Sequence, residues 1–201
     1  MQSMPFFGII AISATFVVTL GEIDLSFPSI VGITSLTFGL VLTATGGNFF
    51  IAFILATSLG MFAGLINGLL VTKIGIPSIV ATIGTLFFWR GLVNVISQGS
   101  GVAIVDVADG TWHHTLFVEK IFNKIPAQFI WFIVLTALMQ WVYRYHKFGN
   151  HIHFVGDNKA SSQMMGINVD NVKIIAFVQL GFFSALAGIF TMYEMLYFWP
   201  T

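Results

Sequence analysis

The chain has 201 residues, and only eight are basic and eight acidic. Charged residues therefore make up 8% of the sequence, against roughly 25% in ordinary soluble domains, while hydrophobic residues reach 57% and the mean hydropathy is +0.92. This composition excludes a soluble enzyme, a nucleic-acid-binding protein and a disordered chain. The absence of Cys excludes disulfides and thiolate metal sites. The remaining class is an integral membrane protein.

The charged residues divide the chain into apolar stretches long enough to cross a bilayer. Residues 1–21 and 25–72 carry no charge, and Gly46-Gly47-Asn48 divides the second stretch with a turn. Because a helical span needs about 20 apolar residues, we predict an all-α, polytopic transmembrane helical bundle with about six spans. The predicted spans are residues 4–21, 29–45, 48–72, 78–98, 128–145 and 174–198.

Two longer polar stretches separate the later spans, residues 99–127 and 146–173. Lys and Arg are more frequent from 144 to 173 than from 99 to 127. The positive-inside rule then places 146–173 in the cytoplasm and 99–127 outside, as an external loop. Residues 1–201 are predicted to form a single transmembrane domain.

Gly60, Gly64 and Gly68 recur every four residues on one predicted span. This spacing creates a shallow groove along one helix face, which allows a neighbouring helix to approach closely. We therefore predict that the three glycines serve helix packing.

Three charged residues intrude on the apolar segments. Arg90 either faces the bundle interior or water, or extends toward the outer interface as a snorkelling side chain. Glu22 and Asp24 are either interfacial residues at a helix end or part of a helix break, because Gly21 precedes them and Pro28 follows them. A broken helix exposes backbone polar groups, which are tolerated only within protein or beside a water-filled cavity.

The sequence carries none of the common catalytic or nucleotide-binding motifs. His113-His114 and His151-x-His153 lack the spacing and the neighbouring carboxylates of a good metal site, so no metal is expected. No P-loop pattern occurs, and therefore no ATP bound by a P-loop of this chain is expected. A membrane-embedded enzyme is the least favoured class, since no nucleophile with a base is evident.

A short helix is predicted within the stretch 146–173. Asn158 is a suitable N-cap, residues 159–165 would form two turns, and Gly166 is a natural C′ residue. Met164 and Met165 on this helix would be adaptable contact residues for a partner, although a simple connector helix has the same pattern.

Three stretches of the sequence match the pattern of a known family. Residues 21–26 (Gly-Glu-Ile-Asp-Leu-Ser) are similar to the family's Gly-Gly-Ile-Asp-Leu-Ser, and residues 64–71, 76–86 and 90–91 follow its fourth and fifth helices. Gly156, Asn158, Gly166 and Ile167 match its coupling loop. The chain thus resembles the permease subunit of bacterial ABC importers for simple sugars, the ribose/xylose/galactose type of the branched-chain amino acid/ribose permease superfamily.

The sequence departs from this family at several positions. Glu22 replaces a Gly, Lys159 stands where an acidic residue is usual, and Ser161-Ser162 replace an Ala pair. Family permeases have about ten spans, whereas this chain begins at what resembles the second helix and ends near the seventh. The resemblance therefore implies a truncated permease.

The resemblance implies that the chain helps to translocate a monosaccharide across the bacterial inner membrane. Implied partners are a cytoplasmic ABC ATPase that binds ATP and Mg²⁺, a second permease subunit, a periplasmic sugar-binding protein and the lipid bilayer, with no nucleic acid and no cofactor in this chain. Two alternatives remain open from the residues. One is an ion-coupled secondary transporter with Asp24 carrying the proton, and the other is an inactive permease remnant.

The resemblance and the polar residues in the spans together define two groups of candidate site residues. The first group would contact the ATPase: Asn158, Lys159, Ser161, Ser162, Met165, Gly166 and Ile167. The second group would line the translocation path or hold a broken helix beside it: Glu22, Asp24, Ser26, Asn67, Thr82, Thr85 and Arg90.

Overall fold

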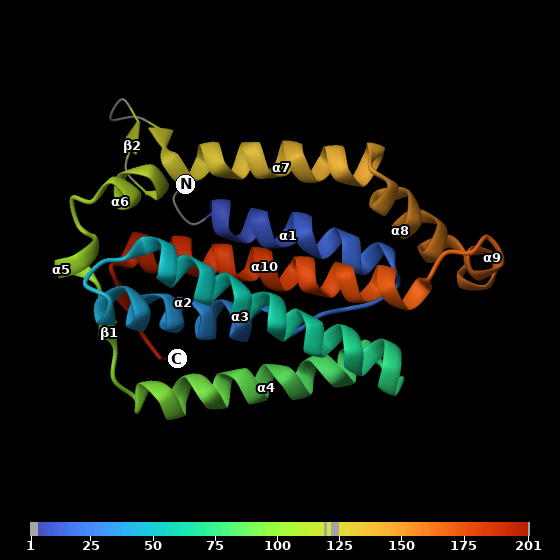
Figure 1. The fold of residues 1–201 in the computed structure, drawn as a ribbon, viewed down its shortest axis with the longest axis horizontal. Coiled ribbons are helices and arrows are strands. Elements are labelled where there is room, and N and C mark those ends of the chain that lie inside the picture. The colour runs from blue at the N-terminus through green and yellow to red at the C-terminus, as the bar shows by residue number, and fades with distance from the viewer. Residues whose placement is uncertain (1–3, 119, 122–124, 201) are drawn as a thin grey trace.

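The computed structural model describes residues 4–118, 120–121 and 125–200, and within them six long helices run side by side (Figure 1). Each long helix coincides with a predicted span, which confirms the all-α bundle. The long helices are α1 (Met4–Thr19), α2 (Phe27–Ala44), α3 (Phe49–Leu69), α4 (Ser78–Ser97), α7 (Ala127–Tyr145) and α10 (Val169–Met195).

Shorter elements lie at the two ends of the bundle. A π-helical turn, η1 (Leu70–Ile74), continues α3 toward Gly75. The strands are two-residue pieces, in which β1 pairs with β4 and β2 pairs with β3, both antiparallel. The short elements are β1 (Val102–Ala103), α5 (Val105–Ala108), α6 (Trp112–Phe117), β2 (Lys120–Ile121), β3 (Ile125–Pro126), α8 (Lys147–Asp157), α9 (Lys159–Met164) and β4 (Tyr197–Phe198).

Helix length and hydropathy support fewer spans than the charge pattern predicts. Among the described residues, α2, α3 with η1 (Phe49–Ile74), α4 and α10 are long and apolar enough to cross a membrane. The first helix is shorter, with 16 residues and a length of about 24 Å, and α7 is not among the four. Four of the six predicted spans therefore meet both criteria, so six is an approximate number.

Helix α10 is the centre of the bundle. It contacts α1, α2 and α3, while α7 and α4 lie on the outer sides (Figure 1). In its most apolar stretch 67% of the residues are buried, against 28% in α4. Phe177, Phe190 and Tyr193 are among its largest fully buried side chains. The burial of α10 from several sides explains why its sequence is apolar around the whole helix.

The three regularly spaced glycines of α3 lie directly against α10. A Cβ added to Gly60 would come within 2.5 Å of the Gly181 carbonyl oxygen, and one added to Gly68 within 2.9 Å of Ile174 Cα. At Gly64 an added Cβ would overlap the Phe177 carbonyl. The two backbones therefore approach more closely than any larger residue would allow.

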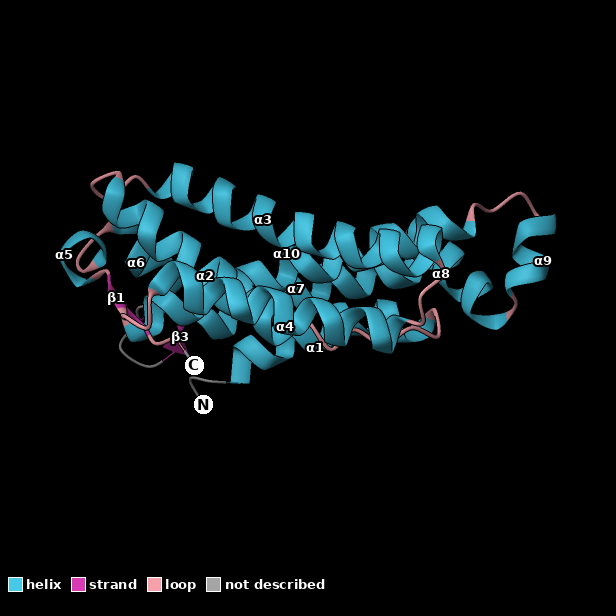
Figure 2. Cartoon of the chain, turned by 90° about the horizontal axis from the view of Figure 1, so that it is seen from below, coloured by secondary structure: helices cyan, strands magenta, loops and turns pink. Residues whose placement is uncertain are grey.

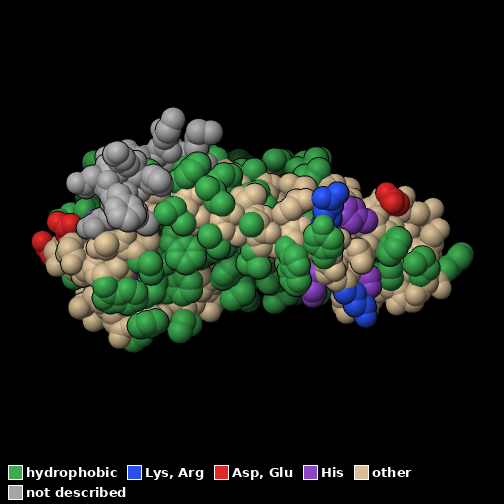
Figure 3. All heavy atoms as spheres, turned by 90° about the horizontal axis from the view of Figure 1, so that it is seen from above, with side chains coloured by type: hydrophobic (Ala, Val, Ile, Leu, Met, Phe, Trp, Pro, Cys, Tyr) green, Lys and Arg blue, Asp and Glu red, His purple; other side chains and the backbone are tan. Residues whose placement is uncertain are grey.

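The two polar stretches lie at opposite ends of the bundle. Residues 99–118 form β1, α5 and α6 at one end, whereas α8 and α9 form the other (Figures 1 and 2). On the face that carries α7 and α8, charged side chains lie toward the two ends of the visible surface, with hydrophobic and uncharged atoms between them (Figure 3). This distribution is what a membrane-spanning bundle requires, since charge is costly in the bilayer core. Which end is cytoplasmic stays a prediction from the charge pattern.

The close contact between α3 and α10 predicts that even a Gly-to-Ala substitution on this face of α3 destabilises the fold. Gly64→Ala would push the helices apart and lower the free energy of unfolding by about 1–3 kcal/mol, the usual cost of overpacking. The control is Gly84→Ala in α4, because a Cβ there meets nothing within 4 Å. Thermal melting of the detergent-solubilised protein checks both variants, and equal melting temperatures for the two would contradict the prediction.

Candidate functional site

The chain breaks its helical path between α1 and α2, in what we call the break segment (residues 20–26). Gly21 has a φ of +75°, which Gly adopts without strain, and residues 22–26 are not helical. Pro28 lies in the first turn of α2. The structure thus shows a non-helical segment between the two helices, with Glu22 and Asp24 inside it. Both residues are buried within the protein, at 8% exposure each.

Side chains of α4 satisfy the backbone of the break segment. The N–H groups of Ile23 and Leu25 donate hydrogen bonds to the hydroxyl oxygens of Ser78 and Thr82, each at 3.1 Å. Unpaired backbone groups are costly where water is absent, so these hydroxyls replace the missing helical bonds. Thr82 is thereby a partner of the break segment.

Asp24 is the centre of a buried hydrogen-bond network. Its Oδ1 accepts bonds from the backbone N–H of Ser26 at 2.7 Å and from its hydroxyl at 2.6 Å. Asn67 Nδ2 on α3 donates to Asp24 Oδ2 at 3.1 Å and to Ser26 Oγ at 2.7 Å. Thr85 on α4 completes the network by donating to Asn67 Oδ1 at 2.7 Å. The network therefore joins the break segment to both α3 and α4.

The structure brings most of the predicted path residues together. Their polar atoms bond largely to one another and to the backbone of the break segment. The group therefore stabilises the conformation of the break segment. The members that the structure joins are Asp24, Ser26, Asn67, Thr82 and Thr85.

Glu22 lies in the same segment but belongs to a different cluster. Its carboxylate forms ion pairs with Lys173 in the first turns of α10 and with Lys159 Nζ on α9, the latter at 3.8 Å. Glu22 and Lys173 are buried, whereas the Lys159 side chain is 56% exposed. The neighbouring Lys173 amine, followed by burial, lowers the pKa of Lys159, and Glu22 acts in the opposite direction.

The ion pair between Glu22 and Lys159 was not predicted from the sequence, although the sequence contains one indication of it. Glu22 and Lys159 both depart from the family pattern, and the two departures introduce opposite charges. Two such changes far apart in the sequence are what a spatial contact would produce.

Arg90 lies apart from both groups. It is exposed on α4 and lines a pocket of about 300 Å³, together with Ser29 of α2 and Trp199 near the end of the chain. No ion pair between the described residues involves Arg90. Its side chain therefore faces this pocket at the bundle surface.

Helix α9 forms as the sequence predicts. Asn158 Oδ1 accepts a hydrogen bond from the Ser161 N–H at 3.0 Å, which caps the helix, and Gly166 follows it with a φ of +80°. The N-cap and the C′ glycine are thus confirmed. Met164 and Met165 are 90% and 61% exposed.

The two serines of α9 differ in their surroundings. Ser161 is exposed, whereas Ser162 is buried and its hydroxyl donates to the Asn158 carbonyl at 2.9 Å. Only Ser161 is therefore available to a partner in this structure.

Helix α8 precedes α9 and was not predicted from the sequence. The many polar residues of this segment made a helix hard to recognise. Its buried face is nevertheless formed by residues spaced three apart, Gly149, Ile152 and Val155. This helical periodicity was the available sign. The predicted coupling stretch therefore contains two helices, with α9 at the extreme end of the bundle (Figure 2).

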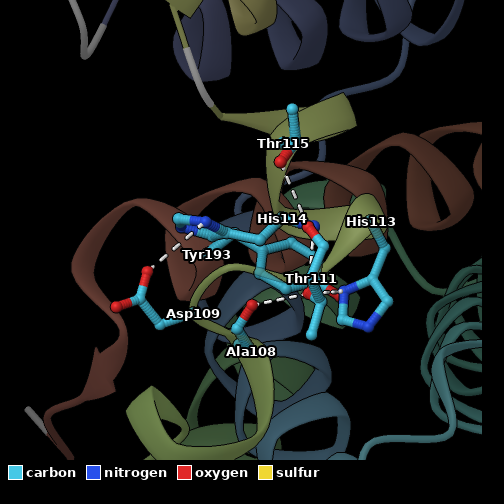
Figure 4. Close-up of polar contacts among 7 residues, drawn as sticks. All are labelled: Ala108, Asp109, Thr111, His113, His114, Thr115 and Tyr193. Carbon is cyan, nitrogen blue, oxygen red and sulfur yellow. Dashed lines mark hydrogen bonds and ion pairs between the residues drawn. The ribbon is translucent and has the colours of Figure 1, made fainter.

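The histidines at the opposite end are part of a packed aromatic cluster. His113 is buried, and its Nδ1 lies 2.8 Å from the Tyr193 hydroxyl and 2.9 Å from the Thr111 hydroxyl (Figure 4). His114 Nδ1 lies 4.0 Å from Asp109. Burial, and then the charge of His114, lowers the pKa of His113. No three His, Cys, Asp or Glu side chains in the described part of the chain are placed to hold a metal ion.

Comparison with known proteins shows one family. A family model described as "branched-chain amino acid transport system / permease component" matches residues 1–201. The autoinducer 2 import system permease protein LsrC of Photorhabdus luminescens is 35% identical over 181 residues, 90% of this chain and 53% of that protein.

Proteins of the same name from two Yersinia species show equal similarity. Those of Yersinia pseudotuberculosis serotype O:3 (strain YPIII) and Yersinia pestis (strain Pestoides F) are each 35% identical over 90% of this chain and 50% of their own lengths. The chain thus spans about half the length of the curated relatives it matches. No solved structure matches the chain significantly.

The Asp24 network predicts that Asn67→Leu is destabilising although Leu has a similar volume. The substitution leaves the Asp24 and Ser26 oxygens and the Thr85 hydroxyl short of a partner in a buried place. We expect a loss of about 2–3 kcal/mol in the free energy of unfolding. The control is Thr72→Val, because among the described residues the Thr72 hydroxyl bonds only to Gly68 O of its own helix turn. Chemical denaturation in detergent measures both, and an Asn67→Leu variant as stable as the control would refute the role of the network.

Burial of His113 predicts that acid destabilises the chain. Its folded pKa lies below the ordinary value of 6.5, so the unfolded chain binds more protons in the interval between the two values. The stabilisation is therefore complete above pH of about 6.5 and decreases as the pH falls below it. We expect the melting temperature to decrease between pH 7.5 and 5.5, and to decrease less in His113→Gln. His151→Gln is the matched control, which should follow the wild type.

Proposed function

We propose a transport function for this chain, because it belongs to the family of branched-chain amino acid transport system permease components. We infer that it forms the membrane-spanning permease part of an ATP-driven importer in the bacterial inner membrane. The chain is a helical membrane protein by its fold, and the proposed role adds the energy source and the direction of transport.

The observation that carries the proposal is the position of α9. This short capped helix lies at the extreme end of the bundle, between α8 and α10, and presents two exposed Met side chains there. Exposed flexible apolar side chains on a polar end of a membrane protein suit a contact with a soluble partner. We assign that partner as a cytoplasmic ABC ATPase, which binds ATP and Mg²⁺.

The substrate class follows from the motifs and from the relatives. The motifs of the chain resemble those of simple-sugar importers, so we propose a monosaccharide as the substrate. The curated relatives are named for autoinducer 2 import, which makes that ligand the first alternative to test. A periplasmic binding protein would deliver the ligand, and a second permease subunit would form the other half of the path.

Two polar regions then have different proposed roles. The Asp24 network holds the helix break, because its groups are used within the network. The pocket beside Arg90 is the better candidate for contact with the substrate, since a guanidinium, a hydroxyl and an aromatic ring meet there and remain open. Such groups suit a polyhydroxylated ligand, which needs hydrogen bonds and apolar ring contact.

A charge on the exposed face of α9 tests the ATPase contact. Ser161→Glu would place a carboxylate in the proposed interface, where a desolvated charge costs more than about 1.4 kcal/mol. We therefore expect substrate-stimulated ATP hydrolysis in vesicles to decrease at least tenfold, with folding unchanged. Thr115→Glu, on α6 at the opposite end, is the control with the same added charge and should retain full activity.

The same experiment separates the proposal from its alternatives. Normal uptake and normal ATPase stimulation in Ser161→Glu would contradict the assignment of α9. Uptake that an uncoupler abolishes, and that does not need the ATPase, would indicate a secondary transporter. Failure to copurify with any ATPase, together with absence of uptake, would indicate an inactive permease remnant.

A further inference from the structure

Glu22 joins three parts of the chain that are distant in the sequence. It lies in the break segment, and its carboxylate contacts Lys173 of α10 and Lys159 of α9. The Glu22 and Lys173 side chains are each 10% exposed, whereas the Lys159 side chain is 56% exposed. One half-exposed ion pair therefore reaches from the terminal helix α9 into the buried break.

The two lysines cannot have the same role. Lys173 is buried against Glu22, so that pair balances the charge of both groups in a place with little water. Lys159 adds a second cation to a carboxylate that already has a partner, which means that it is not needed to compensate Glu22. Because Lys159 stays half in solvent, its contact adds little to stability. The contact does link α9 directly to the break segment.

The break segment is connected onward to two helices. Ile23 and Leu25, on either side of Asp24, bond to α4, and Asp24 itself bonds to Asn67 on α3. A displacement of Glu22 therefore acts on residues that are bonded to both helices. This continuity gives α9 a connection to α3 and α4 besides its covalent links to α8 and α10.

We propose that Lys159 and Glu22 are positioning residues that transmit movement of α9 to the break segment. This inference rests on the proposed function, because α9 moves only if an ATPase acts on it. Because the Lys159 amine pairs with Glu22, we assign it to this contact rather than to the ATPase interface predicted from the sequence. Without the contact, the ATPase would still dock through the exposed Ser161, Met164 and Met165 and hydrolyse ATP, but less of the α9 movement would reach the helices around the break. Transport per ATP hydrolysed would then decrease, while ATP hydrolysis itself would persist.

The chain contains no Cys, so a single label can be introduced without removing native thiols. Met164→Cys places a spin label on an exposed position of α9, and its mobility, measured without the ATPase because Met164 lies in the proposed interface, reports how firmly α9 is held. In Lys159→Gln we expect a more mobile label and, in the unlabelled chain in vesicles with the ATPase, an at least threefold decrease in substrate transported per ATP. Lys159→Arg, which keeps the positive charge, should restore both readouts.

Two further variants test the specificity of the contact. Lys73→Gln removes the exposed Lys73–Asp170 ion pair, at 2.8 Å, and should change neither readout. If Lys159 acts through Glu22, then adding Lys159→Gln to Glu22→Gln should produce no further loss. Glu22→Gln leaves Lys173 buried without a carboxylate and is expected to lower the yield of folded protein, so the single variant Lys159→Gln decides the test if the double variant does not fold.

The outcomes distinguish this inference from the proposed function. If the label in Lys159→Gln is as immobile as in the wild type, Lys159 does not hold α9 in place and the inference is wrong. If the label becomes mobile but transport per ATP is unchanged, the contact has no coupling role. Additive losses in the double variant would show that Lys159 acts through another group and would also overturn it. A wild-type chain without any uptake would refute the proposed function and the coupling role, while the label mobility would still decide whether Lys159 holds α9.

Discussion

Every backbone polar group inside an apolar bundle must find a partner, and this requirement organises the structure around the break between α1 and α2. Helices satisfy it within themselves, but the non-helical break segment cannot. The hydroxyls of Ser78 and Thr82 supply backbone partners from α4, and the Asn67 amide of α3 donates to the side chains of Asp24 and Ser26. The positions of α3 and α4 relative to the break are therefore set by hydrogen bonds rather than by apolar contact alone.

Close packing determines the other side of the same bundle. In a lipid environment helices gain little from the hydrophobic effect, so their association depends on close van der Waals contact. The glycines of α3 allow its backbone to touch that of α10 near Gly181 and Phe177. Helix α10 is consequently buried by three neighbours, and its first turns carry Lys173 into the bundle beside Glu22. Packing thereby places a cation where the break segment has a carboxylate.

The few charged residues of the chain fall into groups with different surroundings. Most charged residues in the described part of the chain lie in the segments at the two ends of the bundle, as expected from the high cost of charge in a bilayer core. The cluster of Glu22, Lys159 and Lys173 differs because it connects an end of the bundle to its interior. Arg90 differs again, since it faces a pocket at the surface. In the proposed transporter these two exceptions serve coupling and substrate contact respectively.

The sequence by itself determined the features that depend on neighbouring residues. Uncharged stretches located the long helices, Gly21 with Pro28 located the break, and Asn158 with Gly166 bounded α9, because propensity, capping and hydropathy are local properties. Only the tertiary structure decided which polar residues meet. It brought Asn67 to Asp24, paired Glu22 with lysines of two other helices, and buried His113 beneath Tyr193, since these contacts join distant segments whose approach depends on packing.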